Sequence, residues 1–262
     1  MRENRLRALL DADAPTLGTR IHSTWPGIVE VIGHTRMFDY VEFLAEYAAF
    51  DLHDLDGLCR AAELHGLATM IKVDQEPRTF LAQRAIGAGF QGVLYADCRS
   101  VDDARGCVAA ARPETPEHGG TYGVGSRRMA YMGYGGSPEY VAALERIVVA
   151  LMIEKRGAVE ELDEILAVKG VDLIQFGPVD YSLSIGRVGE SRGQDIADVQ
   201  RQVIERCIST GVAVRAEVST PDEAEQYREL GVKHFSLGVE LGVLYDWWSA
   251  NGRRLREIVA AE

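Results

Sequence analysis

The stretch LIQFGPVDYS, residues 173–182, begins as a strand and ends with residues that a strand interior rarely contains. Residues 173–176 are mostly apolar, as expected for a strand that packs in a core. Gly177 and Pro178 then shape the backbone, and the carboxylate of Asp180 follows them. The sequence therefore predicts a buried strand that carries an acid just beyond its carboxyl end.

Short apolar runs of the same kind recur along the chain and alternate with helix-like segments, several of which end in glycine. This alternation predicts one domain over residues 1–262, a (β/α)8 TIM barrel. An open doubly wound sheet would show the same alternation, but no GxGxxG motif follows the first run, which favours the barrel. The predicted strands are residues 16–21, 40–45, 68–73, 92–96, 147–153, 172–177, 212–217 and 234–239.

Two segments lie outside this repeat. The amino-terminal sequence MRENRLRALLDAD predicts a charged amphipathic helix. Residues 113–138 are rich in Gly, Tyr and Pro and form a long loop between the fourth and fifth strands, which is typical of a functional loop or a subunit contact. Arg127 and Arg128 in this loop could reach the site of a neighbouring subunit or an acidic surface.

The composition excludes several classes of function. The chain has 262 residues, a net charge of −12 and a pI near 5.0, so we expect no binding to nucleic acid, which requires clustered basic residues. The four cysteines show no CxxC spacing and are expected to be reduced thiols. No signal peptide or long apolar run is present, so we expect a cytoplasmic protein without membrane contact.

The carboxyl ends of barrel strands hold the catalytic groups in such folds, and two acids are prominent there. Glu154 follows one predicted strand and Asp180 follows the next. Adjacent strands lie about 4.8 Å apart, so the two carboxylates would converge and repel each other. A divalent cation, Mg²⁺ or Mn²⁺, would relieve this repulsion, although two separately solvated carboxylates remain the alternative. The turn at residues 177–179 (Gly177, Pro178 and Val179) could present N–H groups to an anionic substrate.

The segment VALMIEKRGAVEELDEILAVKGVDLIQFGPVDYSLSIG, residues 149–186, closely resembles the HpcH/HpaI aldolase family. LGTR, FDYVEFLAEYAAFDLHDL and YRELGVKHFSLGVELGVL extend the resemblance over nearly the whole chain. The resemblance implies a (β/α)8 barrel in a homo-oligomer, often a hexamer or trimer of dimers with a swapped C-terminal helix. It also implies that Glu154 and Asp180 bind the divalent metal, which holds pyruvate as its enolate for aldol cleavage or addition.

The chain departs from the family pattern in the residues that move protons. Leu44 and Tyr47 stand where the family has Asp and His, and Ile86 stands where it has the Asp that supports that His. Lys72 replaces the Arg that grips pyruvate, and Met152 replaces a Gln. The metal-binding half of the site is therefore expected to be retained, while the acid–base half is rebuilt.

We expect Lys72 to be a catalytic and substrate-binding residue that carries a positive charge for an oxyanion, without the two-pronged geometry of Arg. Tyr47 could move a proton only if a nearby cation lowered its pKa. Glu46 could orient Lys72 or hold a metal-bound water. Arg20 could bind a substrate carboxylate or form a surface ion pair. None of the six histidines is expected to be catalytic.

The resulting hypothesis is a divalent-metal-dependent carbon–carbon lyase or synthase that acts on a 2-oxo acid through an enolate. Because the acid–base half differs, a decarboxylation or a cyclisation is an alternative reaction. A further alternative is a protein that has lost catalysis and keeps the metal as a structural scaffold.

Overall fold

The computed structural model describes residues 3–124 and 133–260 of the chain. Within these residues eight parallel strands close into a barrel, in which each strand pairs with the next and β1 pairs with β8. Closure confirms the predicted (β/α)8 fold, because an open sheet would leave two unpaired edges. The strands are β1 (Thr16–Ile21), β2 (Tyr40–Leu44), β3 (Ala68–Val73), β4 (Gly92–Cys98), β5 (Val148–Ile153), β6 (Leu173–Phe176), β7 (Ala213–Val218) and β8 (His234–Val239).

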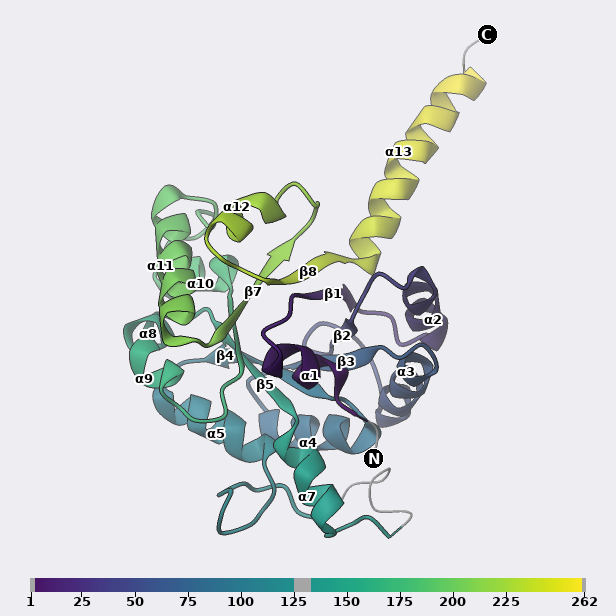
Figure 1. Cartoon of the computed structure of the whole chain (residues 1–262). Coiled ribbons are helices and arrows are strands. Elements are labelled where there is room, and N and C mark those ends of the chain that lie inside the picture. Colours follow the sequence, from purple (N-terminus) through teal and green to yellow (C-terminus); the bar gives the residue numbers. More distant parts are fainter. Residues whose placement is uncertain (1–2, 125–132, 261–262) are drawn as a thin grey trace.

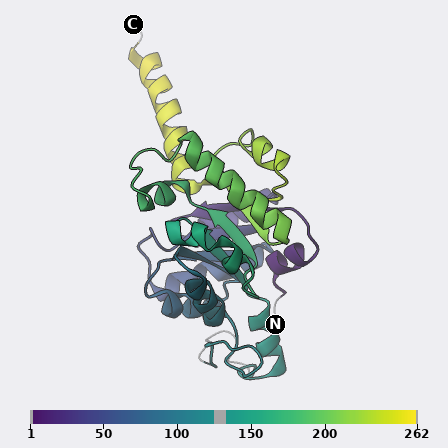
Figure 2. The same cartoon turned by 90° about the vertical axis from the view of Figure 1, so that its left-hand side faces the viewer.

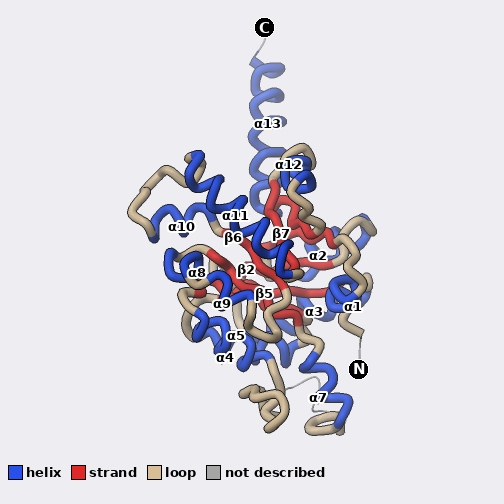
Figure 3. Tube along the Cα trace, turned by 60° about the vertical axis from the view of Figure 1, so that its left-hand side comes forward, coloured by secondary structure: helices blue, strands red, loops and turns tan. Residues whose placement is uncertain are grey.

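Helices surround the barrel, with the strands at the centre (Figures 1 and 3). The strands β2, β3 and β5 are buried at every position, because one face points into the barrel and the other meets the helices. The described helices are α1 (Arg5–Asp11), α2 (Pro26–Thr35), α3 (Leu52–Leu64), α4 (Arg78–Ala88), α5 (Val101–Ala111), α7 (Pro138–Glu145), α8 (Arg156–Glu160), α9 (Leu162–Leu166), α10 (Pro178–Ser184), α11 (Gln194–Thr210), α12 (Ala224–Glu229) and α13 (Glu240–Ala260).

The predicted strands agree with the structure to within about two residues at each end. The fourth strand, expected to end at Ala96, continues to Cys98. Asp180 differs more, because it lies in the first turn of α10 and not directly on a strand end. Pro178 explains this difference, since its fixed φ angle and missing N–H suit the first position of a helix.

The helix α1 closes the amino-terminal end of the barrel interior. Its Leu6 is only 1% exposed and packs in the inner core with Tyr40, Met70 and Leu94. Asn4, at the N-cap of α1, donates hydrogen bonds to the backbone oxygens of Gln91 (2.7 Å) and Arg146 (2.8 Å). The predicted amphipathic helix therefore has a structural role as a plug.

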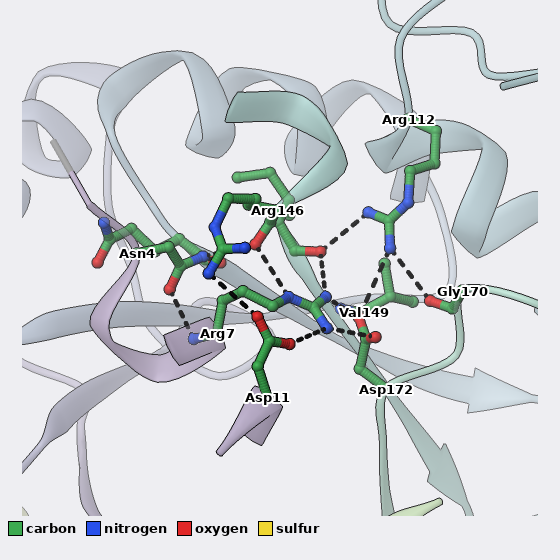
Figure 4. Close-up of polar contacts among 10 residues, drawn as sticks. Asn4, Arg7, Asp11, Arg112, Arg146, Val149, Gly170 and Asp172 are labelled. Carbon is green, nitrogen blue, oxygen red and sulfur yellow. Dashed lines mark hydrogen bonds and ion pairs between the residues drawn. The ribbon is translucent and has the colours of Figure 1, made fainter. Parts of the chain in front are cut away.

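Ion pairs fasten this plug to the barrel (Figure 4). The guanidinium of Arg7 binds both carboxylate oxygens of Asp172, at 2.8 and 2.5 Å. Arg112 approaches the same carboxylate at 3.5 Å and donates to the carbonyl of Gly170 at 3.2 Å. Asp172 in turn accepts the backbone N–H of Val149 at 2.8 Å, so α1 is connected to β5 through the Asp172 carboxylate.

The long loop at residues 113–138 joins α5 to α7, and its residues 125–132 lie outside the described part of the chain. The predictions for Arg127 and Arg128 fall on those residues. Because the loop leads from a helix towards the start of β5, it attaches at the face opposite the strands' carboxyl ends.

The last helix, α13, extends away from the barrel (Figures 1 and 2). None of its residues is buried, although it carries many large apolar side chains. Across the described residues, none of the helices combines the length and the apolar character that a membrane crossing would require.

Replacing Leu6 by Ala should lower the free energy of unfolding by about 3 kcal/mol, because it leaves a cavity under the barrel. Urea unfolding followed by circular dichroism measures this change. Leu64→Ala, at a side chain that is 78% exposed, is the control and should change stability little. Equal effects of the two substitutions would contradict the role of α1 as a plug.

His234 should make the protein acid-sensitive. The residue is 4% exposed, and burial, helped by the charges of Lys233 and Arg215, lowers its pKa from 6.5 to about 4. The unfolded chain therefore binds a proton between pH 6.5 and 4 that the folded chain excludes. Stability should fall as pH drops through this range, by up to about 3 kcal/mol from this residue.

The free energy of unfolding, measured by urea titration at several pH values, tests this expectation. His234→Gln should show a smaller loss of stability between pH 6.5 and 4 than the wild type. The exposed His53→Gln variant should keep the wild-type slope. A wild-type slope in His234→Gln would show that other groups cause the acid sensitivity.

Candidate functional site

Glu154 lies directly after β5, at the carboxyl end of the barrel, and is 2% exposed. Its Oε1 accepts a hydrogen bond of 2.9 Å from the backbone N–H of Asp97. Asp97 has a left-handed φ of 56°, and the pairing of β4 with β5 shifts register between Tyr95 and Cys98. This irregular backbone at the end of β4 turns the amide towards the carboxylate.

Gly177 provides the space that the other carboxylate oxygen occupies. It follows β6 beside Glu154, and a Cβ at this position would lie 2.4 Å from Glu154 Oε2. Any other residue would displace the carboxylate. The Gly in the opening motif is therefore required by the close approach of Glu154, and not by a positive φ angle.

Burial raises the pKa of Glu154 to about 7, and the negative charge of Asp180 adds to this effect. The hydrogen bond from Asp97 and the positive charges of Lys72 and Lys155 oppose it without cancelling it. A further positive charge placed beside such a buried carboxylate stabilises its ionised form.

Several other acids share the barrel mouth with Glu154. Burial and the charges of Glu46 and Asp97 raise the pKa of Asp74, which shows that these carboxylates repel one another. Asp180 contributes from α10, where its side chain is 44% exposed. Within the described part of the chain, the ammonium groups that face this acidic half, from Lys72 and Lys155, are fewer than the carboxylates.

The oxygen donors of Glu154 and Asp180 fit a hard divalent cation whose remaining positions are taken by water or substrate. Among residues 3–124 and 133–260 no cluster of three or more His, Cys, Asp or Glu side chains forms a ready metal cage. This donor set suits Mg²⁺ or Mn²⁺ better than Zn²⁺, which usually binds three or four protein ligands.

Lys72, Glu46 and Tyr47 form a second group beside Glu154. The Lys72 ammonium lies 2.7 Å from Glu46 Oε2 and donates to the Tyr47 hydroxyl at 2.8 Å. Burial alone would lower the pKa of Lys72, but the hydrogen bonds to Glu46 and Tyr47 outweigh it and raise the pKa. Lys72 is therefore held as an ammonium, and Glu46 orients it.

Tyr47 does not have the lowered pKa that removal of a proton at neutral pH would require. Burial raises its pKa to about 12, although the contact with Lys72 acts in the opposite direction. The residue is 58% exposed, and its hydroxyl oxygen accepts a hydrogen bond from Lys72. Lys72 by itself therefore leaves the pKa of this phenol above its ordinary value, a state that suits proton donation, and the catalytic role of Tyr47 stays a prediction.

Arg20 is not a free carboxylate clamp. Its Nη1 lies 2.6 Å from Glu217 Oε2, and its Nε donates to the carbonyl of Gly238 at 3.1 Å. It borders a cavity of about 210 Å³ that Pro178, Glu217 and Tyr227 also line. A substrate carboxylate at Arg20 would have to share it with Glu217, so substrate binding by Arg20 stays a prediction.

A series of hydrogen-bonded polar side chains inside the barrel fixes the ion pair between Arg20 and Glu217. The fully buried Arg215 binds Glu42 and donates through Nε to Gln175 Oε1 at 2.6 Å. Because a guanidinium can only donate, the Gln175 amide must turn its nitrogen to Glu217, which it contacts at 2.6 Å. Glu217 then presents its other oxygen to Arg20.

Several of these functional side chains had no predicted role. Lys155 directly follows Glu154, and its sequence position alone gives it no role. Glu42 and Arg215 could have been noticed as charged residues in the middle of apolar strands, in YVEFL and AVRAEV. The substrate-binding roles of Gly177, Pro178 and Val179 stay predictions.

Comparison with known proteins identifies relatives in sequence and in fold. The profile described as HpcH/HpaI aldolase/citrate lyase matches residues 38–246. The hydroxypyruvate/pyruvate aldolase of Delftia acidovorans is 25% identical over 260 residues, covering 99% of this chain and 95% of that protein. The crystal structure of the HpcH/HpaI aldolase from Desulfitobacterium hafniense superimposes with a TM-score of 0.86 at 23% identity, covering 97% and 98% of the two chains.

A more distant structure shows the fold together with a metal. The protein CITE from Mycobacterium tuberculosis, solved in complex with magnesium and acetate, has a TM-score of 0.57 at 12% identity and covers 90% of this chain and 88% of its own. The profile match extends over most of the sequence and includes the segments that carry Glu154 and Asp180. The chain belongs to the HpcH/HpaI aldolase/citrate lyase family.

Proposed function

We propose that this protein is a divalent-metal-dependent carbon–carbon lyase or synthase that acts on a 2-oxo acid. The observation that carries the proposal is the state of Glu154, a buried carboxylate held by Asp97 over Gly177. Its raised pKa and the surrounding acids favour a cation at this place. The family and the aldolases among the relatives support the reaction class.

Glu154 and Asp180 would hold Mg²⁺ or Mn²⁺ through carboxylate oxygens. The cation, when bound, supplies polarisation of the 2-oxo group and stabilises the negative charge of its enolate. The magnesium in the M. tuberculosis neighbour supports this assignment by analogy. The small 2-oxo acid would bind beside Gly177, Pro178 and Val179, where backbone N–H groups after Pro178 could donate to an anion.

Lys72 supplies a fixed positive charge in the acidic half of the mouth. Glu46 and Tyr47 hold its ammonium in one position, and its raised pKa keeps it protonated. A preorganised charge of this kind stabilises a developing oxyanion without rearrangement during the reaction. Lys72 therefore compensates for the negative charge that the substrate oxygen gains.

Tyr47 supplies a proton in this scheme. Its oxygen accepts from Lys72, and its O–H, which also interacts with Glu46, would donate to the oxygen that an acceptor carbonyl presents. With a pKa of about 12 the phenol is protonated at neutral pH, which is the state needed for carbon–carbon bond formation. By microscopic reversibility, the same oxygen would take this proton back in cleavage.

The scaffold alternative predicts a mouth blocked by Tyr47 and Met152. Met152 is 4% exposed and packs in the inner core below the mouth, whereas Tyr47 is 58% exposed. The exposure of Tyr47 is not the packing that a blocked mouth requires, which favours an enzyme.

We infer that the chain forms a homo-oligomer through α13, as predicted from the family resemblance. The helix extends from the barrel without burying any residue, so its apolar side chains need a partner (Figure 1). A second copy of this chain is that partner, with α13 exchanged between protomers. The exposed apolar residues are Leu241, Val243, Tyr245, Trp247, Trp248, Leu255, Ile258 and Val259.

Glu154→Gln and Asp180→Asn should each lower the metal-dependent activity at least about 100-fold, because each removes a negative charge that binds the cation. Decarboxylation of oxaloacetate with added Mn²⁺ and addition of pyruvate or hydroxypyruvate to glycolaldehyde are the two assays. Asp102→Asn, whose side chain is 86% exposed on α5, should retain full activity.

Wild-type protein that is inactive in both assays with either metal would contradict the proposal. Full metal-dependent activity in Glu154→Gln would contradict it equally. Chelation of the metal should abolish the wild-type activity, and added Mn²⁺ should restore it.

The double variant Trp247→Glu/Trp248→Glu should shift the protein to a smaller species, because charges on the apolar face of α13 oppose its docking. Size-exclusion chromatography with light scattering measures the mass. Arg256→Glu, which changes an already charged position on the same helix, should leave the assembly intact. A wild-type protein that is monomeric at all concentrations would contradict assembly through α13.

A further inference from the structure

Lys155 places an ammonium group between two acids at the barrel mouth. Its Nζ lies 2.5 Å from Asp97 Oδ1 and 3.1 Å from Asp180 Oδ1. The side chains of Lys155 and Asp97 are 14% and 24% exposed and that of Asp180 is 44% exposed, so solvent screens the contact with Asp97 less than the contact with Asp180. From the end of β5, Lys155 thus connects the end of β4 with the first turn of α10.

The position of this ammonium is closely linked to that of Glu154. Asp97 binds Lys155 through its side chain and Glu154 through its backbone N–H. The charge of Lys155 also acts on the Glu154 carboxylate. Lys155 therefore lies beside both carboxylates of the proposed cation site, and it occupies an oxygen of one of them.

A divalent cation held by Glu154 and Asp180 would meet this ammonium. The two positive charges would lie within a few ångströms of each other and would repel. They would also compete for Asp180, since Oδ1 already accepts a hydrogen bond from Lys155. Asp97 offers the ammonium a partner that it can keep when it leaves Asp180.

We propose that Lys155 sets the affinity of the Glu154–Asp180 site for a divalent cation, as a tethered positive charge that must withdraw from Asp180 when the cation binds. Without the cation, the ammonium keeps Asp97 and Asp180 from repelling each other. With the cation bound, the Lys155 ammonium keeps only its ion pair with Asp97. This inference rests on the proposed function, because it requires the cation to bind at Glu154 and Asp180.

The opposite role predicts the opposite effect. If Lys155 served only to hold Asp180 in the geometry for metal binding, removal of the ammonium would loosen Asp180 and weaken the site. If it competes with the cation, removal relieves the repulsion and leaves two unneutralised acids that attract the cation. The sign of the change in affinity therefore separates the two roles.

The test is titration of the full-length protein with Mn²⁺, with free Mn²⁺ measured by electron paramagnetic resonance. Lys155→Met should bind Mn²⁺ about tenfold more tightly than the wild type, because a like charge beside the cation is gone. Its melting temperature without metal should be lower than that of the wild type. Its rise in melting temperature on addition of Mn²⁺ should be larger.

Three further variants control the measurement. Lys155→Arg keeps the charge and should bind Mn²⁺ with an affinity close to that of the wild type. Lys155→Gln removes the charge but keeps a polar side chain, so it should resemble Lys155→Met and serves if that variant does not fold. Lys169→Met removes an exposed lysine elsewhere and should change nothing.

The outcomes distinguish this inference from the proposed function. No Mn²⁺ binding by the wild type, or equal binding by wild type and Glu154→Gln, would overturn the cation site and with it the role of Lys155. Wild-type binding that depends on Glu154, combined with unchanged or weaker binding in Lys155→Met and Lys155→Gln, would overturn the role of Lys155 alone.

Discussion

The burial of the Glu154 carboxylate is the constraint on which the rest of the barrel mouth depends. A carboxylate taken out of water needs hydrogen bonds or positive charges to remain ionised. Asp97 supplies a backbone N–H at the cost of a left-handed conformation, and Gly177 leaves the space for the second oxygen. Lys72 and Lys155 contribute positive charge from either side, yet the pKa of Glu154 still rises to about 7. The backbone at Asp97, the glycine at 177 and the two lysines are thus all arranged around the Glu154 carboxylate.

A second polar system crosses the barrel interior below the mouth. The Glu42–Arg215 pair is completely buried, and such a pair contributes little net stability because desolvation offsets the attraction between the charges. Its structural effect is directional, since it orients Gln175, which orients Glu217 and finally Arg20. The mouth is thereby divided into two halves. The acidic half around Glu154 suits a cation. In the other half, Arg20 is already paired with Glu217, and below it Arg215 is paired with Glu42.

The departures from the family pattern make sense as a group. Tyr47 and Lys72, which replace a His and an Arg, contact each other, and Glu46 completes the arrangement. Neither replacement reproduces the chemistry of the residue that it replaces, because Lys72 is a point charge and Tyr47 holds its proton at neutral pH. Together they form a charged donor and a proton donor at one place. This combination suits the stabilisation and protonation of an oxyanion.

The sequence by itself determined the barrel, the positions of its strands to within about two residues, and Glu154 and Asp180 as neighbouring acids. These properties depend on local apolar periodicity and on the order of elements along the chain, both of which can be read without coordinates. Only the tertiary structure decided that Arg215 pairs with Glu42, 173 residues away, that Glu217 occupies Arg20, and that Lys155 bridges Asp97 and Asp180. It also decided the direction of the pKa shift of Tyr47. Such properties depend on strand register and on the burial of each charge, and both arise only when distant segments close into the barrel.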